Sequence, residues 1–320
     1  MKRNIYSYSK LWMILFVLMG AACTNQEEDA IPVSGQPIGF SVQSDWKEIP
    51  NTRLLIDDNG TMKFTQGDKV QIFGFHTSSP NGVETVQKFM YREDGSNRGQ
   101  IVTYNGTSWN YSPKRFWPKE GNLEFYASYP QNSIHNDADH RMMIYEQTAN
   151  SMKQDLLWGV SIKKCADDRK KNVEITMKHA LAKVNIFFDK SWGDIGTVMF
   201  YAYTAGRFTE TDTDGIPKWE FNDGDKTTSL AVFGYNELLR DDSGTSLTVF
   251  ILPGNITGFQ MFDVPQGNED GKKIDGSDAI SNEIQKKTFK AGQAYKLTIR
   301  RAQKNTNSRS IAMSVRCVSE

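Results

Sequence analysis

Apolar and polar residues alternate along most of the chain beyond residue 35, in short runs with a period of two. Such runs predict β-strands, because successive side chains of a strand point to opposite faces of a sheet. Clusters of Gly, Asn, Asp, Ser or Pro separate the runs about every 8–15 residues, as in antiparallel β-sandwiches. The clearest runs are Ile38–Val42, Val70–Phe75, Leu123–Tyr129, Val173–Met177, Leu247–Ile251 and Tyr295–Ile299. Sustained helical periodicity is almost absent, so we predict an all-β fold of mostly antiparallel strands.

The first 22 residues have the pattern of a signal peptide. Basic residues come first: Lys2, Arg3 and Lys10. The apolar run Leu11–Met19 follows and is shorter than the roughly 20 residues that cross a bilayer. The sequence Gly20-Ala21-Ala22-Cys23 then resembles a bacterial lipoprotein signal, which implies cleavage before Cys23 and lipidation of its thiol. An ordinary signal peptide with an incidental cysteine is the alternative.

Residues 23–35 are expected to form a polar tether. Its acidic stretch, Glu27-Glu28-Asp29, resembles the export signals of surface-exposed lipoproteins in Bacteroidetes. A plain flexible linker has the same composition. The resemblance therefore implies a lipid-anchored protein exposed at the outer membrane, and the linker interpretation stays open.

The division of the remaining chain is indicated by polar segments. The stretch Lys163–Asn172 is the best candidate boundary between two domains. We place one β-sandwich domain at 36–170 and a second at 171–301, which begins with the long strand-like segment Val173–Phe188. Residues 302–320 contain a polar linker and one more alternating run.

Charge and composition exclude several function classes. The chain of 320 residues has 38 basic and 38 acidic residues, and removal of residues 1–22 leaves 35 − 38 = −3. Such a balance argues against nucleic-acid binding, which needs a basic face. Three cysteines and four histidines make a disulfide scaffold or a zinc cluster improbable. Cys165 and Cys317 remain after lipidation of Cys23, and their pairing stays open.

Several phrases along about 270 residues resemble the fimbrillin family of Bacteroidales, the subunits and anchors of donor-strand pili. These phrases are Gly67–Phe73, Trp109–Pro118, Leu123–Pro130, Met177–Val184, Leu252–Gly254 and Phe289–Ile299. The resemblance implies two tandem transthyretin-like β-sandwich domains. It also implies a role as stalk, tip or anchor subunit of a surface pilus in cell adhesion, with other fimbrillin-like subunits as partners. A ligand on a host or bacterial surface stays open.

The aromatic residues of these phrases are expected to build a core. They are Trp109, Tyr111, Phe116, Trp117, Phe125, Tyr126 and Tyr129. His179 lies in an otherwise apolar segment without a nucleophile motif nearby, so we interpret it as a core residue rather than a catalytic base.

An N-terminal strand is expected at Ile38, Phe40 and Val42, whose side chains share one face. In the family that the chain resembles, such a strand fills a groove until a protease removes it. By its position Arg53 resembles the cleavage site of that protease. An uncleaved loop residue, as in anchor subunits, is the alternative.

A C-terminal strand is expected at Ile311, Met313, Val315 and Cys317, which have the same two-residue spacing. The resemblance implies that this strand fills the vacant groove of a neighbouring subunit, which is a form of β-augmentation. The alternative is a last strand that pairs within its own domain.

No motif of an enzyme, a cofactor site or a metal site stands out. Glu210–Phe221 lacks the glutamate that ends a calcium loop, and His135, Asp137, Asp139 and His140 are interpreted as solvated loop residues. We therefore expect a structural protein without a cofactor. A surface glycan-binding lipoprotein, with Trp192 or Trp219 stacked on sugar rings, is the alternative function.

Overall fold

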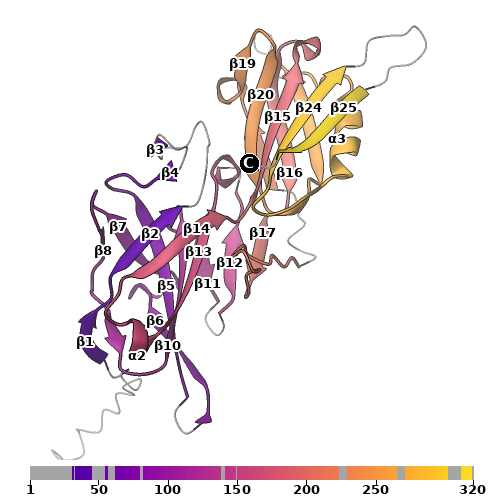
Figure 1. The fold of residues 1–320 in the computed structure, drawn as a ribbon. Helices are drawn as coiled ribbons and strands as arrows, with labels where there is room; N and C mark the ends of the chain where they lie inside the picture. Colours follow the sequence, from indigo (N-terminus) through magenta and orange to yellow (C-terminus); the bar gives the residue numbers. More distant parts are fainter. Residues whose placement is uncertain are drawn as a thin grey trace, which may run out of the picture.

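The computed structural model describes residues 31, 33–44, 55–56, 62–79, 82–137, 141–148, 150–222, 229–264, 271–301 and 311–318 of the chain. Within these residues the regular secondary structure is mostly β-strand, arranged in several sheets (Figure 1). The strands follow the period-two runs of the sequence, and this confirms the mostly β-stranded fold.

An eight-stranded sheet forms one end of the molecule (Figure 1, lower half). Its path is β2 (Phe40–Ser44), β14 (Val173–His179), β13 (Leu157–Lys164), β10 (Asn122–Tyr129), β5 (Lys69–Ser78), β7 (Gln100–Tyr104) and β8 (Trp109–Asn110), with β6 (Thr85–Met90) paired to β5. These pairs are antiparallel except β2 with β14, which run parallel. The two ends of the path, β2 and β8, lie next to each other, so the sheet curves round its inner face.

Strand β14 belongs to this sheet, although we expected a second domain to open at residue 171. The polar segment 163–172 contains the short helix α2 (Cys165–Asp168) and joins the adjacent strands β13 and β14. Val173, Ile175 and Met177 are buried in the same core as Phe40. The chain passes to the next sheet only at Ala180 and Leu181. The apolar alternation in 173–188 continues across this change of sheet, and the sequence pattern therefore did not reveal it.

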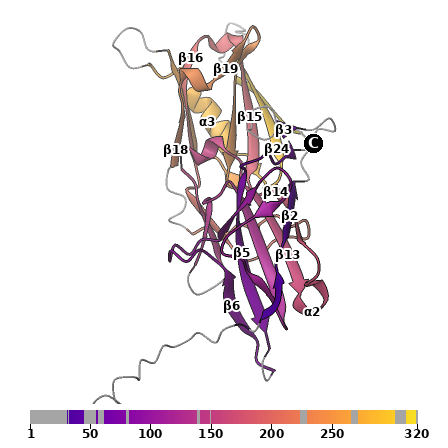
Figure 2. The ribbon, with the colours of Figure 1, turned by 90° about the vertical axis from the view of Figure 1, so that its left-hand side faces the viewer.

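The other end of the molecule contains two further sheets (Figures 1 and 2). The five-stranded sheet has the order β19 (Leu239–Asp241), β20 (Gly244–Ile251), β15 (Ala182–Asp189), β24 (Ala294–Arg301) and β25 (Ile311–Val318). The three-stranded sheet has the order β18 (Ser229–Phe233), β16 (Ile195–Ala202) and β22 (Gly258–Asp263). Helix α3 (Ser277–Gln285) contacts β22. Strands β15 and β24 run parallel, and the other pairs are antiparallel.

Smaller elements connect these sheets. A three-stranded sheet contains β11 (Ile134–Asn136), β12 (Met143–Glu146) and β17 (Ala205–Phe208). Two-stranded pairs are β1 (Val33–Pro37) with β9 (Phe116–Pro118), β21 (Gly254–Asn255) with β23 (Thr288–Phe289), and β3 (Leu55–Ile56) with β4 (Met62–Lys63). Short 3-10 helices are η2 (Ser151–Lys153), η3 (Lys190–Trp192) and η5 (Tyr235–Glu237).

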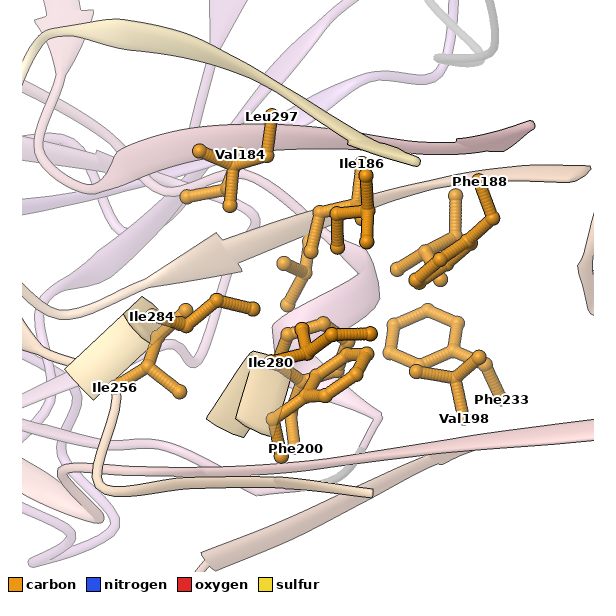
Figure 3. Packing of buried hydrophobic residues seen from close by; sticks show 14 of the residues in the cluster. Val184, Ile186, Phe188, Val198, Phe200, Phe233, Ile256, Ile280, Ile284 and Leu297 are labelled. Atoms are coloured by element: carbon orange, nitrogen blue, oxygen red, sulfur yellow. The ribbon is translucent and has the colours of Figure 1, made fainter. Parts of the chain in front are cut away.

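Three hydrophobic clusters form the interior. The N-terminal cluster lies against the eight-stranded sheet and includes Ile38, Phe40, Val42, Val70, Ile72, Trp109, Tyr111, Trp117, Leu123, Phe125, Val173, Ile175 and Met177. The C-terminal cluster lies between the five- and three-stranded sheets, where Ile280 and Ile284 of α3 add to it (Figure 3). The junction cluster includes Phe73, Phe75, Ile134, Met143, Tyr145, Trp158, Leu181, Phe208, Phe250 and Leu252. It therefore joins the two ends of the molecule.

Most of the aromatic residues expected in a core are buried. Trp109, Tyr111, Trp117 and Phe125 belong to the N-terminal cluster, whereas Tyr126 and Tyr129 are partly buried. Phe116 is 39% exposed and corrects the expectation. It alternates with the buried Trp117 along β9, so its side chain lies on the opposite face.

Candidate functional site

The segment Ile38–Val42 packs into the N-terminal cluster. Strand β2 is the end strand of its sheet, and its ladder pairs Phe40 with Val173 and Val42 with Ile175. Ile38, Phe40 and Val42 are 1%, 4% and 7% exposed, whereas Ser41 and Gln43 are exposed. The apolar face predicted from the sequence is therefore the buried face of the strand.

Phe40 fills an aromatic site in this cluster. Its ring meets Tyr111 and Phe125 edge-on, with centroids 5.5 and 5.4 Å apart. The Trp117 ring also meets Phe125 edge-on, with the centroids 6.4 Å apart. Edge-to-face pairs of this kind contribute about 0.5–1.5 kcal/mol beyond the area that they bury. Phe40 is thus the largest anchor of the segment.

Hydrogen bonds to its backbone hold the segment on both sides. On one side, Val173 N donates to Gly39 O at 2.8 Å. On the other, Ile38 N donates to Arg115 O at 2.9 Å and Ile38 O accepts from Tyr111 Oη at 2.7 Å. The segment therefore occupies a slot between β14 and the connection from β8 to β9.

Gly39 passes close to a side chain at the rim of the slot. A Cβ at this position would lie 2.2 Å from Asn172 Oδ1, so a larger residue requires the Asn172 side chain to turn away. The sequence interpretation missed Asn172 and Tyr111 as partners of this segment. The aromatic segment Trp109–Pro118 predicted that Tyr111 is a core residue, but it did not indicate which strand Tyr111 contacts.

The C-terminal strand predicted at 311–317 is present as β25. It pairs antiparallel with β24 of its own chain, at the edge of the five-stranded sheet. The register sets Met313 opposite Ile299, Val315 opposite Leu297 and Cys317 opposite Tyr295. In this structure the strand therefore completes a sheet of its own subunit. Its role as a donor strand for a neighbouring subunit stays a prediction.

Two predicted sites, Cys23 and Arg53, lie outside the described residues, as do residues 1–30. Lipidation, cleavage and the signal peptide remain predictions. Within the described residues, no helix is long and apolar enough to span a membrane.

Cys165 carries a free, buried thiol in α2. Burial raises the pKa of this thiol to about 11, so it is protonated at neutral pH and a poor nucleophile. The ladder partner of Cys317 is Tyr295, in the five-stranded sheet. The structure does not bring the two cysteines together.

His179 lies at the end of β14, where its Nδ1 forms a hydrogen bond with Asp155 Oδ2. Both side chains are nearly buried, in line with a structural role. The segment at Asp212 is a turn, closed by Gly215 N donating to Asp212 O at 3.0 Å. In the described part of the chain, no group of His, Cys, Asp and Glu side chains is arranged to hold a metal ion; Asp139 and His140 lie outside that part.

The two tryptophans considered for sugar stacking both make contacts within the protein, and for the buried Trp192 this corrects the expectation. Trp192 is 4% exposed, its Nε1 donates to Ile299 O, and the Arg301 guanidinium lies 4.6 Å from its ring. Trp219 donates to Ala180 O at 2.7 Å and packs on Phe208. Trp192 is thus too buried to stack on a sugar ring, whereas Trp219 is partly buried.

Comparisons with known proteins identify the family. Among solved structures, a candidate cell adhesion protein from Bacteroides uniformis is 18% identical and covers 88% of this chain and 98% of its own, with a TM-score of 0.48. The fimbrial anchor protein Mfa2 from Porphyromonas gingivalis is 9% identical over 87% of this chain and 97% of its own, with a TM-score of 0.40. No curated protein matches the chain in sequence. The sequence model described as Fimbrillin-like matches residues 52–314, and the chain therefore belongs to the fimbrillin-like family.

Proposed function

We propose that the protein is a structural subunit of a surface pilus that assembles by donor-strand exchange and acts in cell adhesion. Membership of the fimbrillin-like family supports this role. The observation that carries it is the placement of Ile38–Val42: a segment near the N-terminus fills an apolar slot with three buried side chains. This placement is compatible with a stalk, a tip or an anchor position in the pilus.

Removal of the segment would leave a slot ready for another strand. Each of the three side chains contributes about 1.5–3 kcal/mol by its burial, so the emptied slot favours an extended chain with the same spacing. Val173 N, Arg115 O and Tyr111 Oη supply hydrogen-bonding groups along both sides. Any incoming backbone can use these groups, whereas the aromatic site selects its side chains.

The remaining parts follow from the same proposal. Cys23 carries the lipid anchor at the outer membrane, Arg53 is the cleavage site, and β25 is the donor strand for other fimbrillin-like subunits. Two tandem transthyretin-like sandwiches, expected at residues 36–170 and 171–301, belong to the same proposal, and β14 pairs within the first sheet. No cofactor or catalytic step is required.

Limited proteolysis tests the proposal. We would treat the purified protein with an arginine-specific protease, which spares Lys47, and follow oligomers on SDS gels without boiling. The expected result is a ladder of SDS-resistant multimers whose subunits begin at Leu54. Complete cleavage at Arg53 without a ladder would overturn the proposal.

A matched pair of variants separates cleavage from general damage. Arg53→Ala should abolish both the new N-terminus and the ladder, whereas Thr52→Ala should retain both. A ladder from the Arg53→Ala protein would remove Arg53 from the mechanism.

A further inference from the structure

Exposed apolar side chains lie near both ends of the molecule. Helix α2 lies at one end and strand β19 at the opposite end (Figures 1 and 2). Tyr235 and Leu239, which are 50% and 56% exposed, lie in η5 and at the start of β19. Ile162, which is 65% exposed, lies in β13 just before α2. Exposed apolar residues with charged residues around them are typical of surfaces that bind another protein.

The end with β19 carries an acidic corner. We use this name for two connections, residues 189–194 and 240–244, which are joined by a backbone hydrogen bond of 3.1 Å. They contain four acidic and two basic residues, so 2 − 4 = −2. Tyr235 lies beside them, because Arg240 stacks on its ring at 3.6 Å and donates to Ile195 O at 2.7 Å. The apolar and charged groups of this end are therefore held in one fixed surface.

The end with α2 carries the opposite charge. Its basic segment, residues 163–171, contains five basic and two acidic residues, so 5 − 2 = +3. Lys164 and Lys170 are exposed. A backbone hydrogen bond of 3.0 Å holds the segment to the turn from β9 to β10. The basic segment and the exposed Ile162 next to it are thus the counterpart of the acidic corner.

We propose that the acidic corner of one copy of this chain docks on the basic segment of the next copy, which gives the pilus an end-to-end interface in addition to strand exchange. This inference rests on the proposed function and adds a second contact surface. Opposite charges attract and orient the two surfaces, and the apolar side chains are buried between them. Because the contact joins two different surfaces at opposite ends, it can repeat along a filament.

The course of the chain puts the next copy at the acidic corner. Arg301 ends β24, where its backbone N donates to Ser191 Oγ at 3.3 Å and its guanidinium lies 4.6 Å from the Trp192 ring. The chain therefore leaves β24 beside the corner, and the ten steps from Arg301 to Ile311 span at most about 35 Å. A neighbour that receives the strand beginning at Ile311 must lie within that distance.

Cleavage strengthens this contact. Residues 23–53 contain five acidic and two basic residues, so 2 − 5 = −3, and their removal leaves 33 − 33 = 0 for the rest of the chain. Val33 pairs with Pro118 in β9, the strand that leads to the turn bonded to the basic segment. The acidic stretch 27–29 lies within about 20 Å of Val33 by chain length. The uncleaved chain thus carries acidic residues of its own within reach of its basic segment.

Charge reversal at each end tests the interface. One variant combines Asp194→Lys with Asp242→Lys, another combines Lys164→Glu with Lys170→Glu, and neither adds an arginine for the protease. After cleavage, light scattering follows assembly at low and high salt. We expect each variant alone to assemble about tenfold more slowly than the unaltered protein at low salt. An equimolar mixture should recover the original rate, because unlike ends then meet again.

A matched control reverses two exposed acids between the ends. Glu146→Lys lies in β12, and Asp214→Lys lies in the turn after β17; together they should leave the rate nearly unchanged. A chain with all four end substitutions should assemble like the unaltered protein, and circular dichroism should show the same fold for every variant.

The outcomes separate this inference from the proposed function. A mixture that stays slow, a control that slows equally, or single-end variants that assemble at the original rate would each overturn the interface, while their SDS-resistant ladders would leave strand exchange standing. Failure of the unaltered protein to form a ladder after cleavage would overturn the proposed function, and the interface with it.

Discussion

At the scale of single residues, Phe40 and Tyr111 determine how firmly the N-terminal segment is held. Phe40 places its ring against two aromatic neighbours, and the Tyr111 hydroxyl donates to the backbone of Ile38. One contact is apolar and the other polar, so substitutions can separate them.

Phe40→Ala should lower the free energy of unfolding by about 3–5 kcal/mol, because it removes a buried ring and leaves a cavity. Urea denaturation of the uncleaved protein measures this. Ser41→Ala, at an exposed neighbour, should change the value by less than about 0.5 kcal/mol. Equal effects at both positions would contradict the packing of Phe40.

Tyr111→Phe should remove one hydrogen bond and lower stability by about 0.5–1.5 kcal/mol at neutral pH. Burial raises the pKa of Tyr111 from 10.0 to about 12. The unfolded chain therefore loses this proton first, and the contribution of Tyr111 is fully present below pH 10.0 and declines as the pH rises toward 12. Denaturation of both proteins across this range should show the difference between them shrinking. A constant difference would contradict the burial of the hydroxyl.

The period-two pattern predicts which residues of the segment are buried, because alternation is a local property. Ile38, Phe40 and Val42 were identified in this way. Asn172 and Tyr111 were not recognised as their partners, since that contact depends on how strands distant in sequence come together. The local pattern thus predicts which face of a strand is buried, but it does not predict which strand or side chain packs against that face.

At the scale of elements, strands could be predicted but their membership of a sheet could not. A polar segment such as residues 163–172 is expected both at a domain boundary and at a connection between adjacent strands. Here it contains α2 and connects β13 with β14, which is the second case. The alternation of β25 likewise fits a donor strand and an edge strand equally. The structure places it at an edge, paired with β24.

Met313→Asp should abolish the ladder while the cleaved subunit stays folded, because a carboxylate on the apolar face of the proposed donor strand would lose its solvation in the slot. Met313→Leu conserves volume and should retain assembly. SDS gels report assembly, and circular dichroism reports the fold. A ladder from the Asp variant, or an unfolded monomer, would exclude the donor role of Met313.

At the scale of the whole molecule, the junction cluster packs elements from both ends of the molecule into one shared core. It receives Phe73 from β5 and Trp158 from β13, Phe208 from β17, and Phe250 from β20. The rings of Trp158 and Phe208 meet edge-on at 4.9 Å. Elements of both halves therefore share buried surface.

We expect the protein to unfold in a single calorimetric transition, and Phe208→Ala to split it in two, since the variant weakens the shared core and leaves the other two clusters intact. Scanning calorimetry, with comparison of the calorimetric and van't Hoff enthalpies, measures this. Val249→Ala, within the C-terminal cluster alone, should lower the transition temperature without splitting. A split in the Val249→Ala protein, or none in the Phe208→Ala protein, would contradict the role of the junction.

The parallel ladder between β2 and β14 joins positions 133 residues apart. Closing so long a loop is slow and costs chain entropy, so contacts of this kind form late in folding. We therefore expect the rest of the sheet to form first and the N-terminal segment to enter a nearly complete subunit last. A segment that arrives last can leave with the other strands in place.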